Sequence, residues 1–176
     1  YNMTSFPEAG KHGFVFGLAG FSGSGKTTLA EKLISALCQR GFSVASIKHA
    51  HHAFDADTPG KDSWRHRKAG ATQMIVSSSL RRVKFTETPD GDEADLNTLL
   101  GEINPADFVL VEGYKNLDFP KIEIWREEEA NPFLHETRPG IRMVASDTAL
   151  PECPLPVLDL NNIESIADAV EKRLVA

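Results

Sequence analysis

Short apolar runs and amphipathic segments alternate along this chain from residue 14 onward. Continuous apolar runs at 14–19 and 107–111 predict buried strands, whereas the alternating segment 121–126 predicts a strand with one wet face. Apolar residues recurring every three or four positions predict helices. The expected strands are 14–19, 43–47, 72–76, 82–86, 107–111, 121–126, 141–145 and 157–158, and the expected helices are 28–40, 62–69, 94–103 and one starting within 161–164.

Strands that alternate with helices favour an α/β fold, in which helices cover both faces of a mostly parallel sheet in a three-layer sandwich. The strand-helix-strand order over 14–47 implies a parallel pair with a right-handed crossover. Residues 1–13 lack periodicity and are expected to form a flexible N-terminal tail. Residues 14–176 then form a single domain of ordinary size.

The segment between the first strand and the first helix has the sequence GFSGSGKT over residues 20–27. We call it the glycine loop, because it fits the pattern G-x-x-x-x-G-K-[ST] of P-loop nucleoside triphosphatases. A strand, a glycine loop and a helix in this order aim backbone N–H groups at a polyphosphate. Lys26 is expected to reach the β- and γ-phosphates and Thr27 to offer its hydroxyl to Mg²⁺. The expected nucleotide-binding residues here are Gly20, Ser22, Gly23, Ser24, Gly25, Lys26, Thr27 and Thr28.

A second chemical feature is Glu112, which ends the apolar strand 107–111. Ligands gather at the carboxyl ends of parallel strands, so this carboxylate is expected near the glycine loop. It could hold Mg²⁺ through water or orient a water molecule. Glu112 could instead be an ordinary surface acid at the end of a strand. Its position at the carboxyl end of a parallel strand favours a functional role.

A polar segment rich in His and Asp follows the second strand over residues 48–63. It could be a switch-like loop that contacts phosphate and Mg²⁺, or an anion site built from Lys48 and the histidines. His49, His51 and His52 could also bind a transition metal, although no Cys is present and no helix sets their spacing. A solvated polar loop is the fourth possibility, and loops at this edge of a parallel sheet often carry function.

Asp147 follows the expected strand 141–145. A carboxylate there could accept hydrogen bonds from guanine N1–H and N2–H₂. The chain has no N-K-x-D pattern nearby, and Ser-Asp after a strand also starts ordinary turns.

Composition excludes some classes of function. The net charge of −6 argues against broad nucleic-acid binding, which needs a basic surface. No segment is long enough and apolar enough to span a bilayer. Cys38 and Cys153 lie far apart without metal-binding spacing, which is typical of free thiols in a reducing cytosol.

Four further segments accompany the glycine loop in a fixed order. They are IKHAHH at 47–52, DTPGKDS at 57–63, KAGA at 68–71 and VEGYK at 111–115. Together with the glycine loop, this set resembles the molybdopterin-guanine dinucleotide biosynthesis adaptor family, protein B (MobB), over most of the chain. The K-H-x-H-H and D-x-x-G-K-D-S elements are far more specific than the loop itself. Tyr114, where the family often has Phe, is a minor departure.

The resemblance implies a cytoplasmic GTP-binding protein with weak GTPase activity that uses Mg²⁺. It also implies a homodimer that assists the guanylyltransferase attaching GMP to molybdopterin, with molybdopterin and the molybdenum-insertion protein as further partners. By resemblance, a shared polar site is formed by Lys48, His49, Asp57, Lys61 and Asp62.

Three hypotheses of function follow from these features, and the third is a nucleotide-dependent interaction module without useful turnover. In the first, a GTP-binding adaptor hydrolyses GTP slowly. In the second, a small-molecule P-loop kinase uses the same loop together with an acceptor pocket and an arginine lid from Arg81, Arg82 or Arg126. For the first hypothesis, the expected catalytic residues are Lys26, Glu112 and Asp57, the Mg²⁺ ligands are Thr27, Glu112 and Asp57, and the further nucleotide-binding residues are Lys48, His49, Lys61, Asp62 and Asp147.

Overall fold

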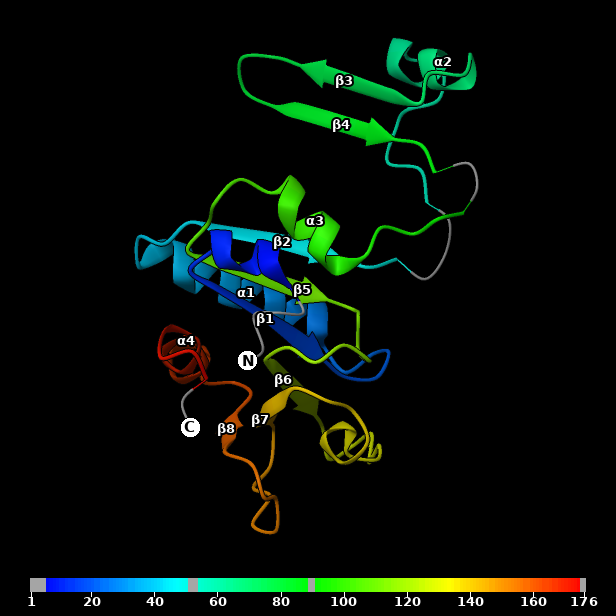
Figure 1. Cartoon of the computed structure of the whole chain (residues 1–176). Helices are drawn as coiled ribbons and strands as arrows, with labels where there is room; N and C mark the ends of the chain where they lie inside the picture. The colour runs from blue at the N-terminus through cyan, green and yellow to red at the C-terminus, as the bar shows by residue number, and fades with distance from the viewer. Residues whose placement is uncertain (1–5, 51–53, 89–90, 175–176) are drawn as a thin grey trace. The chain divides into compact units, whose positions relative to one another are not determined.

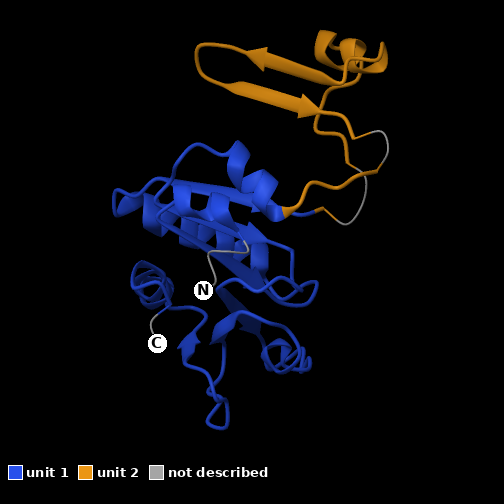
Figure 2. Cartoon of the chain, in the orientation of Figure 1, with its two compact units in different colours: residues 1–49, 96–176 blue, residues 50–95 orange. Residues whose placement is uncertain are grey.

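A computed structural model describes residues 6–50, 54–88 and 91–174 of the chain. The chain divides into two compact units (Figure 2). Unit 1 comprises Tyr1–His49 and Leu96–Ala176, and unit 2 comprises Ala50–Asp95. The single domain expected over 14–176 stays a prediction, and within that range the segment between β2 and α3 makes its own contacts.

Unit 1 is built on a six-stranded sheet with the order β2-β5-β1-β6-β7-β8 (Figure 1). Every neighbouring pair of strands in it is parallel. The mostly parallel sheet predicted from the alternation of strands and helices is confirmed. The strands are β1 (Phe14–Ala19), β2 (Val44–Lys48), β5 (Phe108–Glu112), β6 (Lys121–Trp125), β7 (Ile141–Ser146) and β8 (Val157–Asp159).

Helices cover both faces of this sheet. On one face, α1 (Lys26–Gln39) and α4 (Ile163–Glu171) bury residues such as Leu33 and Ile166 against Phe16 of β1. On the other face, α3 (Leu96–Glu102) and the short 3-10 helix η1 (Pro7–Lys11) pack against Val15 and its neighbours. Adjacent β1 residues serve opposite cores because side chains alternate along a strand. The three-layer α/β sandwich is therefore confirmed.

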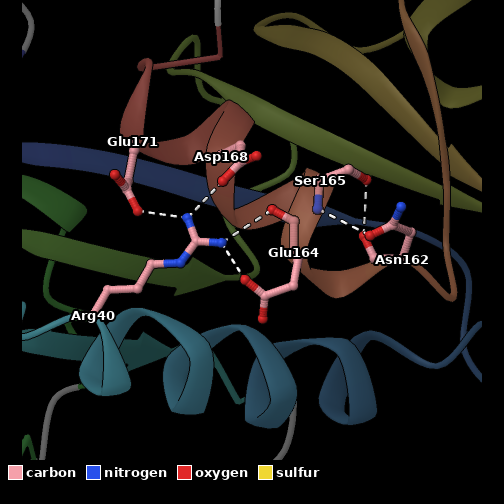
Figure 3. Close-up of polar contacts among 6 residues, drawn as sticks. All are labelled: Arg40, Asn162, Glu164, Ser165, Asp168 and Glu171. Carbon is pink, nitrogen blue, oxygen red and sulfur yellow. Dashed lines mark hydrogen bonds and ion pairs between the residues drawn. The ribbon is translucent and has the colours of Figure 1, made fainter.

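Arg40, at the C-terminal end of α1, joins that helix to α4 (Figure 3). Its Nη1 donates hydrogen bonds to Asp168 Oδ1 at 2.7 Å and to Glu171 Oε1 at 2.6 Å. Its Nη2 pairs with the carboxylate of Glu164 and donates to the Glu164 carbonyl oxygen at 3.3 Å. One guanidinium thus links three acids on α4 to the C-terminal end of α1.

The first turn of α4 confirms the helix start expected within 161–164. Asn162 is the N-cap residue, and its Oδ1 accepts a hydrogen bond from Ser165 N at 3.1 Å. This bond satisfies one of the free N–H groups at the helix start.

Residues 6–13 include η1 and pack against the rest of unit 1, whereas the flexibility expected for the tail over 1–13 stays a prediction. Phe6 and Ala9 are buried, and the Phe6 ring meets the Phe119 ring edge-on with centroids 6.3 Å apart. Glu8 N donates to Asn97 Oδ1 at 3.0 Å. Two apolar anchors hold this segment even though it lacks periodicity, and residues 1–5 lie outside the described residues.

Strand β6 differs from its sequence-based expectation, because neither face is wet. It lies between β1 and β7, and Lys121 and Glu123 are each 1% exposed. Glu123 accepts hydrogen bonds from the backbone N–H groups of Leu134 at 2.6 Å and His135 at 3.0 Å. The His135 ring Nδ1 also lies 2.7 Å from Glu123 Oε2. The alternation thus reflects buried polar anchors for the segment between β6 and β7, rather than a solvated face.

Lys121 is the second buried charge of β6. Its Nζ donates to the carbonyl oxygens of Pro139 at 2.9 Å and Phe119 at 3.4 Å, and also to that of Leu117. Burial lowers the pKa of Lys121 from 10.5 to about 8, with a smaller opposing effect from the charge of Asp118. The charged form is therefore costly to bury at neutral pH.

This shift predicts how stability depends on pH. Between pH of about 8 and 10.5 the unfolded chain keeps the Lys121 proton and the folded chain releases it, so stability rises with pH. Relative to Lys121→Met, wild type should gain up to about 3 kcal/mol across this window. Urea unfolding of both proteins at several pH values measures the difference. Parallel pH profiles of the two proteins would contradict burial as the cause of the shift.

Unit 2 contains α2 (Asp62–Lys68) and an antiparallel pair formed by β3 (Gln73–Ser77) and β4 (Arg82–Thr86). These strands were expected from the sequence, but they form a sheet of their own. Arg67 organises the unit by pairing with Asp55 at 2.9 Å, Asp57 at 2.9 Å and Glu87 at 2.5 Å.

None of the helices in the described residues combines the length and apolar content that a membrane-spanning segment requires.

Candidate functional site

The glycine loop connects β1 directly to α1 in unit 1. Gly25 is the N-cap residue of α1 with φ of 90°, and Gly23 has φ of 88°. Residues with a side chain rarely adopt these left-handed conformations. A Cβ at Gly20 would lie 2.5 Å from Ser24 Oγ, so a side chain there would displace the Ser24 hydroxyl. Gly23 and Gly25 thus adopt conformations that favour glycine, and the phosphate-binding role of the loop stays a prediction.

Ser24 lies inside the loop and is only 2% exposed. Its Oγ is buried and has no hydrogen-bond partner among the described residues. Buried hydroxyl groups are usually paired, so the Ser24 hydroxyl is available to a ligand. Ser24 was one of the predicted nucleotide-binding residues.

Lys26, the first residue of α1, folds back over the loop. Its Nζ donates to the carbonyl oxygens of Gly20 at 2.8 Å and Phe21 at 2.6 Å. Burial lowers the pKa of Lys26, while the carboxylates of Glu112 and Glu129 act in the opposite direction. Lys26 is therefore close enough to both acids to feel their charge.

Glu112 is the last residue of β5 and lies between Leu18 of β1 and Lys48 of β2. Its Oε2 is 3.5 Å from Lys48 Nζ. Its Oε1 is buried and makes no hydrogen bond to any described residue. The sequence-based expectation that this acid lies near the glycine loop is consistent with the register, because Leu18 is two residues before Gly20.

His49 lies next to Glu112. Its backbone N–H donates to the Glu112 carbonyl oxygen at 2.8 Å, and its ring stacks on Tyr114 with centroids 4.8 Å apart. Gly113 has φ of 101°, and a Cβ there would lie 2.5 Å from His49 Cβ. The VEGYK segment and the start of the His-rich segment thus meet at the carboxyl edge of the sheet.

Arg126 also lies at this site, although the sequence suggested it only as a residue of a kinase lid. It follows β6, and its Nε donates to the Ser24 carbonyl oxygen at 3.0 Å. Its Nη1 is 3.6 Å from Asp147 Oδ2, and Asp147 Oδ1 accepts a hydrogen bond from Glu127 N at 3.0 Å. Its position in the sequence could have identified it, because Arg126 directly follows β6 and Glu112 ends β5, so both lie at the carboxyl ends of parallel strands. The guanine-binding role expected for Asp147 stays a prediction.

The residues around the glycine loop fit Mg²⁺ better than a transition metal. Thr27 lies exposed in the first turn of α1, and Glu112 Oε1 is unpaired as described above. Hydroxyl and carboxylate oxygens, together with phosphate and water, are the ligands that Mg²⁺ prefers. Within the described residues, no group of three or more His, Cys, Asp or Glu could hold a metal. His51 and His52 lie outside the described residues.

Asp57, Lys61 and Asp62 belong to unit 2 rather than to the unit of the glycine loop. Asp57 Oδ1 accepts hydrogen bonds from Ser63 Oγ at 2.8 Å and Thr58 N at 2.9 Å, while its Oδ2 binds Arg67. Lys61 and Asp62 are exposed at the start of α2. In the structure Asp57 contacts residues of unit 2, among them Arg67, and the catalytic and Mg²⁺ roles expected for it stay predictions.

A pocket of about 860 Å³ opens at the other end of the strands. Its lining includes Phe14 and Ile141, the first residues of β1 and β7, as well as His12 and Arg142. None of the predicted site residues lines it, so it is separate from the candidate site.

Comparison with known proteins identifies close sequence relatives. A family model described as molybdopterin guanine dinucleotide synthesis protein B (MobB) matches residues 15–147. A molybdopterin-guanine dinucleotide biosynthesis adapter protein of Escherichia coli is 44% identical over 86% of this chain and 88% of that protein. The protein with the same description in Haemophilus influenzae is 42% identical over 91% of this chain and 89% of its own length.

Solved structures give the same result at the level of the fold. The MobB protein homolog from Bacillus stearothermophilus superposes with a TM-score of 0.68 at 25% identity, covering 91% of this chain and 97% of that one. Bacillus subtilis MobB gives a TM-score of 0.72 at 23% identity, covering 92% and 98% of the two chains.

Proposed function

This chain belongs to the molybdopterin guanine dinucleotide synthesis protein B (MobB) family, and from that premise we propose that it is a GTP-binding adaptor with slow GTPase activity. In this role it assists the guanylyltransferase that attaches GMP to molybdopterin, and it acts in the cytoplasm. Molybdopterin itself and the molybdenum-insertion protein are further candidate partners.

The geometry of the glycine loop carries this proposal. The loop ends at the start of α1, where free backbone N–H groups and the helix dipole favour an anion. Lys26 lies within the loop, and Glu112 ends the strand next to β1. A cradle of N–H groups, a lysine and an acid at the neighbouring strand end suit a nucleoside triphosphate with Mg²⁺.

Slow hydrolysis is the expected chemistry of such a site. Water attacks the γ-phosphorus, the bond to the β–γ bridging oxygen breaks, and GDP and phosphate leave. Bound Mg²⁺ would neutralise charge that develops on the phosphate oxygens. Thr27 and Glu112 would hold the ion, Lys26 would stabilise the transferred phosphoryl group, and Glu112 could orient the water.

The test is a measurement of GTP and ATP binding and turnover, with and without the guanylyltransferase and molybdopterin. We expect GTP to bind in preference to ATP, and slow GTP turnover that responds to the partner. Transfer of the γ-phosphate to a small acceptor would contradict the adaptor and support the kinase hypothesis. ATP binding with no response to GTP would contradict it as well.

The same family membership leads us to propose that the chain works as a homodimer, with unit 2 forming the contact. None of the residues of α2 is buried, and Val76 and Val83 form a cross-strand pair that is 43% and 39% exposed. Leu80 in the hairpin turn is 95% exposed. A two-stranded hairpin with so little core is marginal by itself, and a second copy would cover these apolar side chains.

Val83→Asp should therefore convert the dimer to a monomer, because it places a charge among apolar side chains of the proposed contact. Thr86→Asp is the matched control, since Thr86 lies on the other face of β4 and pairs with Gln73. Sedimentation velocity of wild type and both variants measures the change. A Val83→Asp protein that remains dimeric would rule out this face as the interface.

A further inference from the structure

Arg126 lies against the helix end of the glycine loop. Its Nε–H bonds the Ser24 carbonyl oxygen at 3.0 Å, and a Cβ added to Gly25 would lie 3.0 Å from its Nη2. A narrow cavity of about 30 Å³ is lined by this guanidinium together with Gly25, Thr28 and Lys32. Arg126 therefore contacts the loop where α1 begins.

Asp147 forms an ion pair with the guanidinium. Its Oδ2 lies 3.6 Å from Arg126 Nη1, while its Oδ1 accepts from Glu127 N at 3.0 Å. The carboxylate is thus held by backbone at the end of β7 and presents its other oxygen to the arginine. A planar guanidinium that makes one hydrogen bond and one ion pair is more restricted in orientation than a lysine ammonium would be.

The charge of Arg126 has a ligand-binding consequence. The guanidinium lies beside the positive end of the α1 dipole and next to Gly25, the residue that precedes Lys26. Only Asp147 pairs with it among the described residues, and its Nη2 makes no hydrogen bond to any of them. The guanidinium and the N-terminus of α1 both favour an anion bound at this end of the loop.

Arg126 and Lys26 approach the loop from opposite ends. Lys26 Nζ lies at the carbonyl oxygens of Gly20 and Phe21, whereas Arg126 lies at Ser24 and Gly25. In such loops the backbone N–H groups hold the α- and β-phosphates, and the lysine reaches the β- and γ-phosphates. Arg126 is therefore placed near the phosphates that nucleoside di- and triphosphates share.

We propose that Arg126, oriented by Asp147, is a nucleotide-positioning residue that braces the glycine loop and binds the phosphates next to α1. The proposal rests on the nucleotide binding proposed above and adds a residue and a role to it. Asp147 acts on the nucleotide through Arg126 rather than by reading the base.

The first test is calorimetric titration of GTP and GDP into wild type, Arg126→Ala and Arg126→Lys. Arg126→Ala should weaken the binding of both nucleotides by about tenfold or more and to the same extent. Arg126→Lys should recover only part of the loss, because it keeps the charge without the two-contact geometry. Arg142→Ala is the matched control: Arg142 follows the first residue of β7, at the opposite end of the strand from Asp147.

A purely structural role is separated from phosphate binding by chemical rescue. Guanidinium ion added at a concentration well below the denaturing range should restore part of the nucleotide affinity of Arg126→Ala, and it should leave wild type unchanged. The melting temperature of nucleotide-free Arg126→Ala should stay close to that of wild type. A large loss of stability without rescue would overturn the proposed role.

Asp147→Asn tests the orienting contact. It should weaken GTP and ATP binding by the same factor, and it should add little to Arg126→Ala in the double variant. Loss of GTP affinity alone would show that Asp147 reads guanine and would overturn this part of the proposal. If wild type bound no nucleotide, the proposed function itself would fail, whereas equal affinity of wild type and Arg126→Ala would overturn only the role of Arg126.

Discussion

Lys26→Ala should weaken GTP binding by about a hundredfold or more while leaving the fold intact. The Lys26 ammonium is the positive charge held inside the glycine loop, where it donates to the carbonyl oxygens of Gly20 and Phe21. In the nucleotide complex it would exchange these contacts for phosphate oxygens. Since the ammonium is already partly desolvated, which lowers the pKa of Lys26, it forms strong contacts with an anion.

Titration with GTP and GDP measures this effect. GTP should lose more affinity than GDP, because Lys26 is expected to reach the γ-phosphate. Lys172→Ala is the control: it removes an exposed lysine after α4, on a different helix from the loop. Thermal unfolding without nucleotide should show little change, because the two loop bonds of Lys26 are small terms in stability. An unchanged GTP affinity would disprove the assignment of the glycine loop to phosphate.

Gly140→Ala should destabilise the folded chain by about 3 kcal/mol or more, the largest effect on stability that we expect from a single methyl group. Gly140 precedes β7 and has φ of 80°. A Cβ there would lie 2.1 Å from the Phe119 carbonyl oxygen and 2.9 Å from the Phe119 N. These are backbone atoms next to β6. The Lys121 N–H also donates to the Gly140 carbonyl oxygen at 2.9 Å, which holds the backbones of Gly140 and Phe119 close together.

Gly41→Ala is the matched control for this variant. Gly41 has φ of 91°, but an added Cβ would meet no atom within 4 Å. Gly41→Ala should lower the free energy of unfolding by only about 1–2 kcal/mol, which is the strain of a left-handed conformation in a residue with a side chain. Urea unfolding of both variants then separates backbone strain from the steric clash. Equal losses in the two variants would show that the close approach at Gly140 is relieved in solution.

The glycine loop and the strand ending at Glu112 can be recognised in the amino-acid sequence alone. Both depend on local rules: a glycine pattern that needs positive φ, and an apolar run long enough for one buried strand. Their meeting at one sheet edge follows from the parallel order of strands, and the register places Glu112 beside Leu18. Local signals therefore identify the central part of the candidate site.

The β6 strand shows where local rules fail. Alternation of Lys121 and Glu123 with apolar residues indicates a wet face when only neighbouring residues are considered. In the structure Lys121 donates to backbone carbonyl oxygens before and after the strand, and Glu123 accepts from backbone N–H groups after it. The role of Arg126 is hidden from local rules for a similar reason, because its partners Ser24 and Asp147 lie 102 and 21 residues away in sequence.

The sequence by itself determined the order and type of the elements, the glycine pattern of residues 20–27 and the family resemblance. These features depend on backbone preference and hydrophobic period, which act over a few residues. Only the tertiary structure decided that the 50–95 segment forms its own unit, that β6 is buried on both faces and that Arg126 contacts the glycine loop. Each of these depends on which distant groups satisfy a buried charge or cover an apolar face, and no local pattern contains that information.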